Sequence, residues 1–203
     1  MRCIVTVATE EYVPLQERMV ESLSAAGYRD GLLRWTDSLP PGSPSHEQAP
    51  YGFKVYAFRE ARRRGFTSVL WLDAPAFVRA GLDPLFEGIE RDGHFFVGGE
   101  ERLGRGSSDA CLEAFSLSRA EAMGAGLMNG TFIGLDLTRP RTLLWFEEWG
   151  RACERGLFNG NHGHRHDEAV GSCVAFRLGM GLRAWGEVFG RGPLGYDKSL
   201  ATS

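Results

Sequence analysis

The stretch Thr67-Ser-Val-Leu-Trp-Leu-Asp-Ala-Pro75 decides the fold. The run up to Leu72 is nearly all apolar, which is typical of a strand buried on both faces of a parallel sheet. Asp73 then places a carboxylate at the carboxyl end of that strand. Burying a carboxylate is costly unless it is hydrogen-bonded, paired or bound to a metal, so Asp73 is a candidate functional residue. The alternative is that it only caps the tight bend at Pro75.

Strand and helix signals alternate on both sides of this run. Apolar runs predict further strands at Arg2–Thr9, Gly31–Trp35, His94–Val97 and Thr131–Leu135. Helical spacing predicts helices from Pro14 to Gly27 and at Tyr51–Arg64, Leu82–Ile89, Leu143–Arg155 and His166–Leu178, and a helical stretch after Ser108 up to about Met123. Loop or extended structure is expected at Ser38–Pro50, Gly98–Ser108, Gly156–Arg165, Leu182–Phe189 and in the tail from Gly190. This order predicts one α/β domain over residues 1–203, a sandwich with a mostly parallel central sheet flanked by helices.

Length and composition exclude several classes of protein. The 203 residues suffice for one ordinary core, and 43% apolar with 24% charged residues is a globular composition. The net charge of −3 does not favour a bulk electrostatic hold on nucleic acid or on anionic membranes. Because no apolar run reaches about 18 residues, we expect no membrane span. Four widely spaced cysteines predict reduced thiols in a cytoplasm-like compartment and no zinc cage.

Three familiar motifs are missing from the sequence. There is no phosphate-binding G-x-x-x-x-G-K-[ST], no G-x-G-x-x-G between a strand and a helix, and no G-x-S-x-G turn. The sequence therefore argues against P-loop hydrolysis, Rossmann redox chemistry and α/β-hydrolase chemistry.

In parallel α/β sheets, ligands bind outside the carboxyl ends of the strands. This rule selects Thr9 and Tyr12 after the first strand, Asp73 after the central strand, and the loops that hold Asn129 and His164–Asp167. Asn129 offers donors and acceptors to a hydroxylated ligand, or belongs to a plain turn before a strand.

Gly163-His-Arg-His-Asp-Glu168 opens a predicted helix and combines imidazoles with carboxylates. Asp167 falls in the first turn, where backbone N–H groups and the helix dipole stabilise a carboxylate, so it is a candidate catalytic or substrate-binding residue. His166 is a candidate metal ligand, provided that it converges with a carboxylate on one point. A solvated helix cap is the alternative for the whole segment.

Lys54 and Lys198 are the only two lysines. Lys54 begins a predicted helix, where the dipole disfavours a cation, so a phosphate partner and plain solvation are both open. Lys198 ends the tail segment Gly195-Tyr-Asp-Lys198. Two interpretations are open: its ammonium contacts a phosphate, or the segment is a frayed terminus.

Taken in order, these segments resemble the GT-A type glycosyltransferases. The first strand with Thr9 and Tyr12 is similar to the nucleotide-binding unit of that family, and Lys54 followed by Leu70-Trp-Leu-Asp73 resembles the stretch that leads into its D-x-D motif. Its later segments resemble Leu82-Asp-Pro-Leu-Phe86, Met128-Asn-Gly-Thr-Phe-Ile-Gly134, Gly163-His-Arg-His-Asp167 and Gly195-Tyr-Asp-Lys198. Two metal ligands of the family are missing, because Pro75 and Gly192 stand where a carboxylate and a histidine are usual.

The resemblance implies a glycosyltransferase with a nucleotide-diphosphate sugar as donor, UDP being the nucleotide to test. The acceptor hydroxyl would belong to a glycan, a protein, a small molecule or modified DNA. Mn²⁺ or Mg²⁺ would lie at Asp73 with help from His166 or Asp167, unless the enzyme works without metal or has lost activity.

The resemblance also implies a role for each candidate side chain. Asp167 would act as the base, with Asp73 as the other catalytic carboxylate. Lys54 and Lys198 would meet the charge of the leaving diphosphate. Next to Thr9, Tyr12 would stack on the nucleotide base, and Asn129 would orient sugar hydroxyls.

Two other functions stay open. A module that binds a nucleotide sugar without turning it over would explain the missing second aspartate. A sugar nucleotidyltransferase would be expected to carry a glycine-rich basic loop after the first strand, where this chain has Thr9-Glu-Glu-Tyr12.

Overall fold

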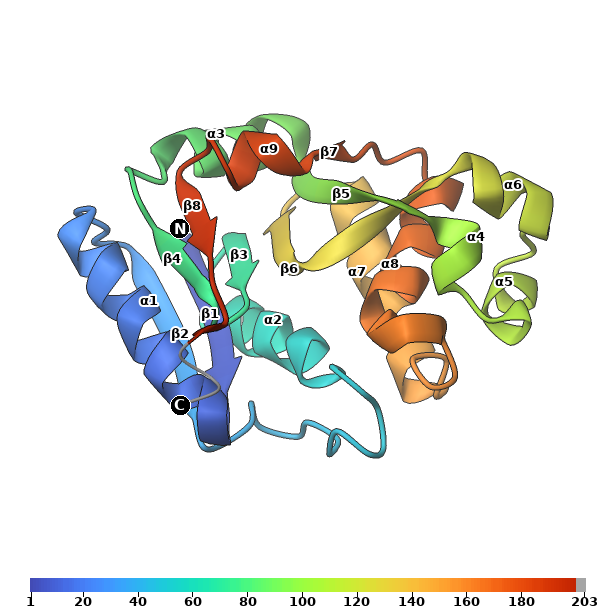
Figure 1. Cartoon of the computed structure of the whole chain (residues 1–203), viewed down its shortest axis with the longest axis horizontal. Helices are drawn as coiled ribbons and strands as arrows, with labels where there is room; N and C mark the ends of the chain where they lie inside the picture. The colour runs from blue at the N-terminus through green and yellow to red at the C-terminus, as the bar shows by residue number, and fades with distance from the viewer. Residues whose placement is uncertain (200–203) are drawn as a thin grey trace.

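The computed structural model describes residues 1–199, without the side chains of residues 99, 100 and 164. A six-stranded sheet in the order β2-β1-β3-β6-β5-β7 runs through the molecule (Figure 1). Its strands are β1 (Arg2–Ala8), β2 (Gly31–Thr36), β3 (Ser68–Leu72), β5 (His94–Arg102), β6 (Gly126–Asp136) and β7 (Arg183–Ala184). Within this sheet only β6 runs in the opposite direction, antiparallel to β3 and β5. The predicted α/β architecture with a mostly parallel sheet is confirmed.

Helices cover both faces of the sheet. On one face lie α2 (Phe53–Arg63), α7 (Pro140–Glu154) and α8 (His166–Arg177), and on the other α1 (Val13–Ala25), α3 (Asp83–Asp92) and α9 (Trp185–Val188). All five residues of β3 are buried, as its apolar run predicts. Val69 and Trp71 join the core beneath α2 and α7, whereas Leu70 and Leu72 join the core beneath α1 and α3. The strand therefore holds both layers together.

Short helices lie between the main elements. They are the helices η1 (Glu10–Tyr12), α4 (Leu103–Gly106), α5 (Asp109–Ala114), α6 (Arg119–Gly124) and η2 (His162–His164). Of these, α5 and α6 fall in the stretch predicted to be helical. The predicted loop at Gly98–Ser108 is wrong, because β5 continues to Arg102 and α4 follows directly. The continuation depends on pairing with β6, a partner that the local sequence does not reveal.

The C-terminal segment folds back onto the middle of the chain. β8 (Leu194–Tyr196) pairs antiparallel with β4 (Ala76–Val78), so the prediction of a loop from Gly190 is wrong. The extended piece predicted just before it is instead the short β7 followed by α9. Arg18 of α1 fastens the fold-back by donating to the Pro75 carbonyl at 3.1 Å and the Asp197 carbonyl at 2.7 Å. The tail thereby lies beside the segment that follows β3.

None of the helices in the described part of the chain is long and apolar enough to cross a membrane. The four cysteines are buried and free, and the Sγ atoms of Cys111 and Cys173 lie 4.0 Å apart.

Candidate functional site

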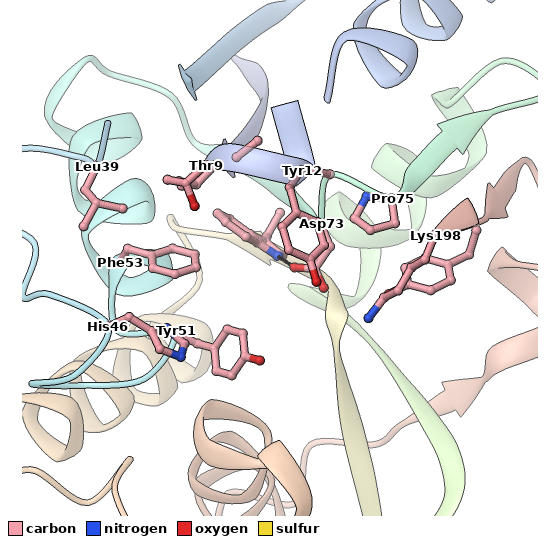
Figure 2. A pocket seen from close by; sticks show the side chains of 14 residues that line it. Thr9, Tyr12, Leu39, His46, Tyr51, Phe53, Asp73, Pro75 and Lys198 are labelled. Carbon is pink, nitrogen blue, oxygen red and sulfur yellow. Dashed lines mark hydrogen bonds between the residues drawn. The ribbon is translucent and has the colours of Figure 1, made fainter. Parts of the chain in front are cut away.

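A cavity of about 530 Å³ lies where β1 and β3 end. Figure 2 shows Thr9 and Tyr12 at its upper edge and Asp73 near its centre. Leu39, His46, Tyr51 and Phe53 form one wall, and Pro75 and Lys198 lie opposite. The cavity thus combines flat aromatic surfaces with one carboxylate and one ammonium, at the edge of the sheet where ligands of such folds bind.

Asp73 reaches this cavity while its carboxylate is already partly engaged. Its Oδ1 accepts a hydrogen bond from Trp71 Nε1 at 2.8 Å and lies 3.5 Å from Lys54 Nζ. Its backbone N–H donates to the carbonyl of Thr131 at 3.0 Å, which fixes the end of β3 against β6. The side chain is 28% exposed, so a ligand in the cavity can reach it.

Lys54 is a buried cation behind the cavity wall, with 3% of its side chain exposed. Its Nζ lies 5.1 Å from the Tyr51 ring and 5.4 Å from the Trp71 ring, and both rings line the cavity. Burial alone would lower the pKa of this ammonium, but the carboxylates of Asp167 and Asp73 outweigh burial and raise its pKa above the usual range. Lys54 therefore stays charged, although it does not itself line the cavity.

Asp167 shares the Lys54 ammonium with Asp73. Nζ of Lys54 donates to Asp167 Oδ2 and to the Gly130 carbonyl, both at 2.9 Å. The Asp167 side chain is 3% exposed and does not line the cavity. Asp73 and Asp167 are thus joined by a shared cation and not by a shared cleft. The Asp167 carboxylate, which the resemblance suggested as the base, does not face the cavity.

Glu168 completes the buried cluster, and the sequence did not single it out. Its Oε1 accepts from the Gly130 N–H at 2.7 Å, and its Oε2 accepts from Arg165 at 2.9 Å. Burial and, second, the negative charge of Asp167 raise the pKa of Glu168 to about 7. The hydrogen bond from Gly130 and the charge of Arg165 lower this pKa, but by less. Its place three residues after Arg165, on the same helical face, was the available signal.

Lys198 supplies the ammonium that lines the cavity. In Figure 2 it lies on the wall opposite Tyr51 and extends its amino group toward Asp73. Its Nζ is 5.8 Å from the ring of Tyr196, the last residue of β8. Burial alone would lower the pKa of Lys198, but Tyr196, Tyr12 and Asp73 together raise it. The pairing of β8 with β4 is what brings this tail residue to the site.

The other predicted side chains lie near the site but not on its walls. Asn129 belongs to β6, and its Oδ1 accepts from the Thr131 N–H at 2.8 Å. Nδ1 of His166 lies 2.9 Å from the Phe158 carbonyl, and the His166 ring stacks on Tyr51 at 6.0 Å between centroids. The side chain of His164 lies outside the described residues.

The donor set around Asp73 does not fit a divalent cation. Mg²⁺ and Mn²⁺ prefer several oxygen ligands in a near-octahedral array. Asp73 offers one carboxylate whose Oδ1 is already engaged by Trp71 and Lys54, and Pro75 offers no ligand. Among the side chains that the structure describes, no three His, Cys, Asp or Glu residues gather as a metal site. Lys54 and Lys198 are the cations of this site.

The aromatic wall is the part of the site that sequence reasoning missed. Leu39 and His46 come from a proline-rich segment that was assigned only as loop, and Tyr51 and Phe53 were assigned to the start of a helix. Tyr51 and Phe53, directly after this proline-rich loop, were the available signal, since ligand pockets are lined mainly by apolar and aromatic side chains.

No protein-family model matches the sequence, and no curated protein does. Solved structures of glycosyltransferases have a similar fold. Mouse xyloside xylosyltransferase 1 in its apo form gives a TM-score of 0.56 at 11% identity, over 91% of this chain and 85% of that chain. The apo structure of the bifunctional glycosyltransferase WbbM gives a TM-score of 0.54 at 11% identity, over 84% of this chain and 36% of that chain. The chain thus spans about a third of WbbM, and the likeness establishes a GT-A-like fold.

Proposed function

We propose that the chain is a glycosyltransferase that moves a sugar from a UDP-sugar to a hydroxyl acceptor, and that residues 1–203 form one GT-A-like domain. One observation carries this proposal: Asp73 and Lys198 face the same cavity at the carboxyl ends of β1 and β3. The fold of known glycosyltransferases supports it. A cavity of about 530 Å³ also lies within the usual size range of small-molecule sites.

The cavity divides by chemistry into two parts that suit a nucleotide diphosphate. Thr9 and Tyr12 present a hydroxyl and an aromatic ring at the end of β1, which suit a ribose and a base. Lys198 presents an ammonium on the tail, and it suits the negative charge that develops on the leaving diphosphate. Lys198 is exposed in the free protein, so this charge interaction strengthens only when a bound ligand displaces water from the cavity.

The transfer step needs a leaving group, a new bond and a proton acceptor. The bond between the anomeric carbon and the diphosphate oxygen breaks, and its electron pair leaves with UDP beside Lys198. The acceptor oxygen forms the new bond to the same carbon. Its proton passes to the carboxylate of Asp73, the acid that lines the cavity in the described part of the chain.

Lys54 and Asp167 act on this step through Asp73. Lys54 Nζ, held by Asp167 and the Gly130 carbonyl, lies 3.5 Å from Asp73 Oδ1. Trp71 donates to the same oxygen. These contacts fix the rotamer of Asp73 and leave its other oxygen for the substrate, so Lys54 and Asp167 are positioning residues.

A binding module without turnover is the second candidate, because Pro75 takes the place of the usual second aspartate. The two candidates differ in one product. An enzyme releases UDP from a UDP-sugar, even when water is the acceptor, whereas a module binds the sugar nucleotide and leaves it intact.

The experiment measures binding heat and UDP release for a panel of UDP-sugars. We expect both, with release reduced about 10²–10⁴-fold in Asp73→Asn. Lys198→Met should weaken UDP binding about tenfold or more, since it removes a charge-assisted contact. Arg29→Met, which removes an exposed cation near the end of α1, serves as the matched control. Binding without release favours the module, and a folded protein that does neither would refute the proposal.

A further inference from the structure

Tyr51 combines an unfavourable backbone conformation with a central place in the cavity wall. Its φ is +60°, a left-handed conformation that is costly for a bulky side chain. Such residues persist only where their surroundings hold them, and they gather at functional sites. A Cβ added at the adjacent Gly52 would lie 2.9 Å from Cys153 Sγ, so the chain is pressed closely against α7 at this point.

The Tyr51 ring is held from several sides. It stacks on His166 with centroids 6.0 Å apart, meets His46 edge-on at 5.0 Å and contacts Phe53 at 6.2 Å. Figure 2 shows its hydroxyl pointing toward the middle of the cavity. The loop before α2, the helix itself and the start of α8 therefore converge on one side chain.

Behind the ring lies a buried ion pair. Lys54 Nζ is 5.1 Å from the Tyr51 ring and pairs with Asp167 Oδ2 at 2.9 Å. Both side chains are 3% exposed, although ammonium and carboxylate groups are the kinds of partner that sugar hydroxyls bind. Tyr51 thus lines the cavity, whereas the Lys54–Asp167 pair behind it does not.

We propose that the Tyr51 ring sets how large a sugar the cavity admits, because the ring bounds the cavity on the side of the Lys54–Asp167 pair. The inference rests on the proposed function. With the ring in place the cavity accepts a sugar without a bulky substituent. A smaller side chain at position 51 adds the volume of the ring to the cavity and admits an acetamido group.

The test compares UDP-glucose with UDP-N-acetylglucosamine, which differ by that group. Dissociation constants and kcat/KM for UDP release are measured for the wild type, Tyr51→Phe and Tyr51→Ala. The preference for glucose should fall by about tenfold or more in Tyr51→Ala, because one buried group can give such discrimination. Tyr51→Phe keeps the ring and should keep the preference. Alanine and tyrosine share the cost of a positive φ, so the comparison isolates side-chain size.

Tyr56→Ala removes a ring from α2, outside the cavity wall, and should leave the preference unchanged. UDP alone is titrated against every variant, and unchanged affinity shows that the folded site is preserved. Normal UDP binding with the wild-type preference in Tyr51→Ala would overturn the role of Tyr51 while leaving the proposed function standing. Failure of the wild type to bind UDP or either UDP-sugar would overturn both.

Discussion

Lys54 Nζ lies 2.9 Å from Asp167 Oδ2, although 113 residues separate them in the chain. The contact joins the first turn of α2 to the first turn of α8, and both side chains are 3% exposed. The same ammonium lies 3.5 Å from Asp73 Oδ1 at the end of β3. One buried cation therefore connects the two helices to the residue that faces the cavity.

Lys54→Met should strongly destabilise the fold. It leaves the carboxylate of Asp167 buried and without its cation, and breaking a buried pair from one side costs about 3–5 kcal/mol. Chemical denaturation measures the loss. Adding Asp167→Asn to Lys54→Met should restore part of it, because the buried charge is then gone as well. Equal stability of the single variant and the wild type would contradict the buried pair.

Gly130→Ala should disturb the cluster from the strand side. A Cβ at this position would lie 2.9 Å from both Asp167 Oδ2 and Lys54 Nζ, and 3.0 Å from Glu168 Cγ. We expect a loss of about 1–3 kcal/mol of stability, as for other overpacked sites, together with slower UDP release. Gly124→Ala is the control, since a Cβ there has open space and the glycine ends α6. Similar behaviour of the two variants would contradict the tight packing at Gly130.

Glu168 should make stability depend on pH. Its pKa is raised from 4.5 to about 7, so the folded state holds a proton that the unfolded state releases. This contribution is fully present below pH 4.5 and is lost as the pH rises to about 7. The wild type should therefore lose about 3 kcal/mol relative to Glu168→Gln across that interval. Denaturation at a series of pH values tests this, with Glu113→Gln as an exposed control. Parallel curves for the wild type and Glu168→Gln would contradict the raised pKa.

Metal removal should change UDP binding little. The donor set offers one partly engaged carboxylate, and Lys198 supplies the cation that faces the cavity. We expect the affinity for UDP in EDTA to lie within about tenfold of that in Mn²⁺. Calorimetry under both conditions measures it, and Lys198→Met should lower the affinity under both. Binding that appears only with Mn²⁺ would show that a metal completes the site.

The sequence identifies those features of the site that depend on local pattern. The apolar run before Asp73 predicts both the buried strand and the place of its carboxylate. Asp167 also falls in the first turn of a helix, as predicted. Its burial could have been anticipated, because the following residues are small or apolar, and Ala169–Ala175 are buried throughout.

Features that depend on contacts between segments far apart in the chain could not be predicted from local sequence patterns. The pairing of β8 with β4 joins two three-residue strands with no periodicity of their own, and it decides where Lys198 lies. The single cation shared by Asp73 and Asp167 likewise depends on how α2 and α8 pack against the sheet. Neighbouring residues do not determine that packing.

A crystal structure with UDP tests the central claim most directly. The account predicts the diphosphate within hydrogen-bonding distance of Lys198 Nζ, with the uracil against Tyr12 and the ribose near Thr9. Asp73 should then face the terminal phosphate, where a transferred sugar would begin. UDP bound on another surface, or no UDP in the cavity at saturating concentration, would contradict the account.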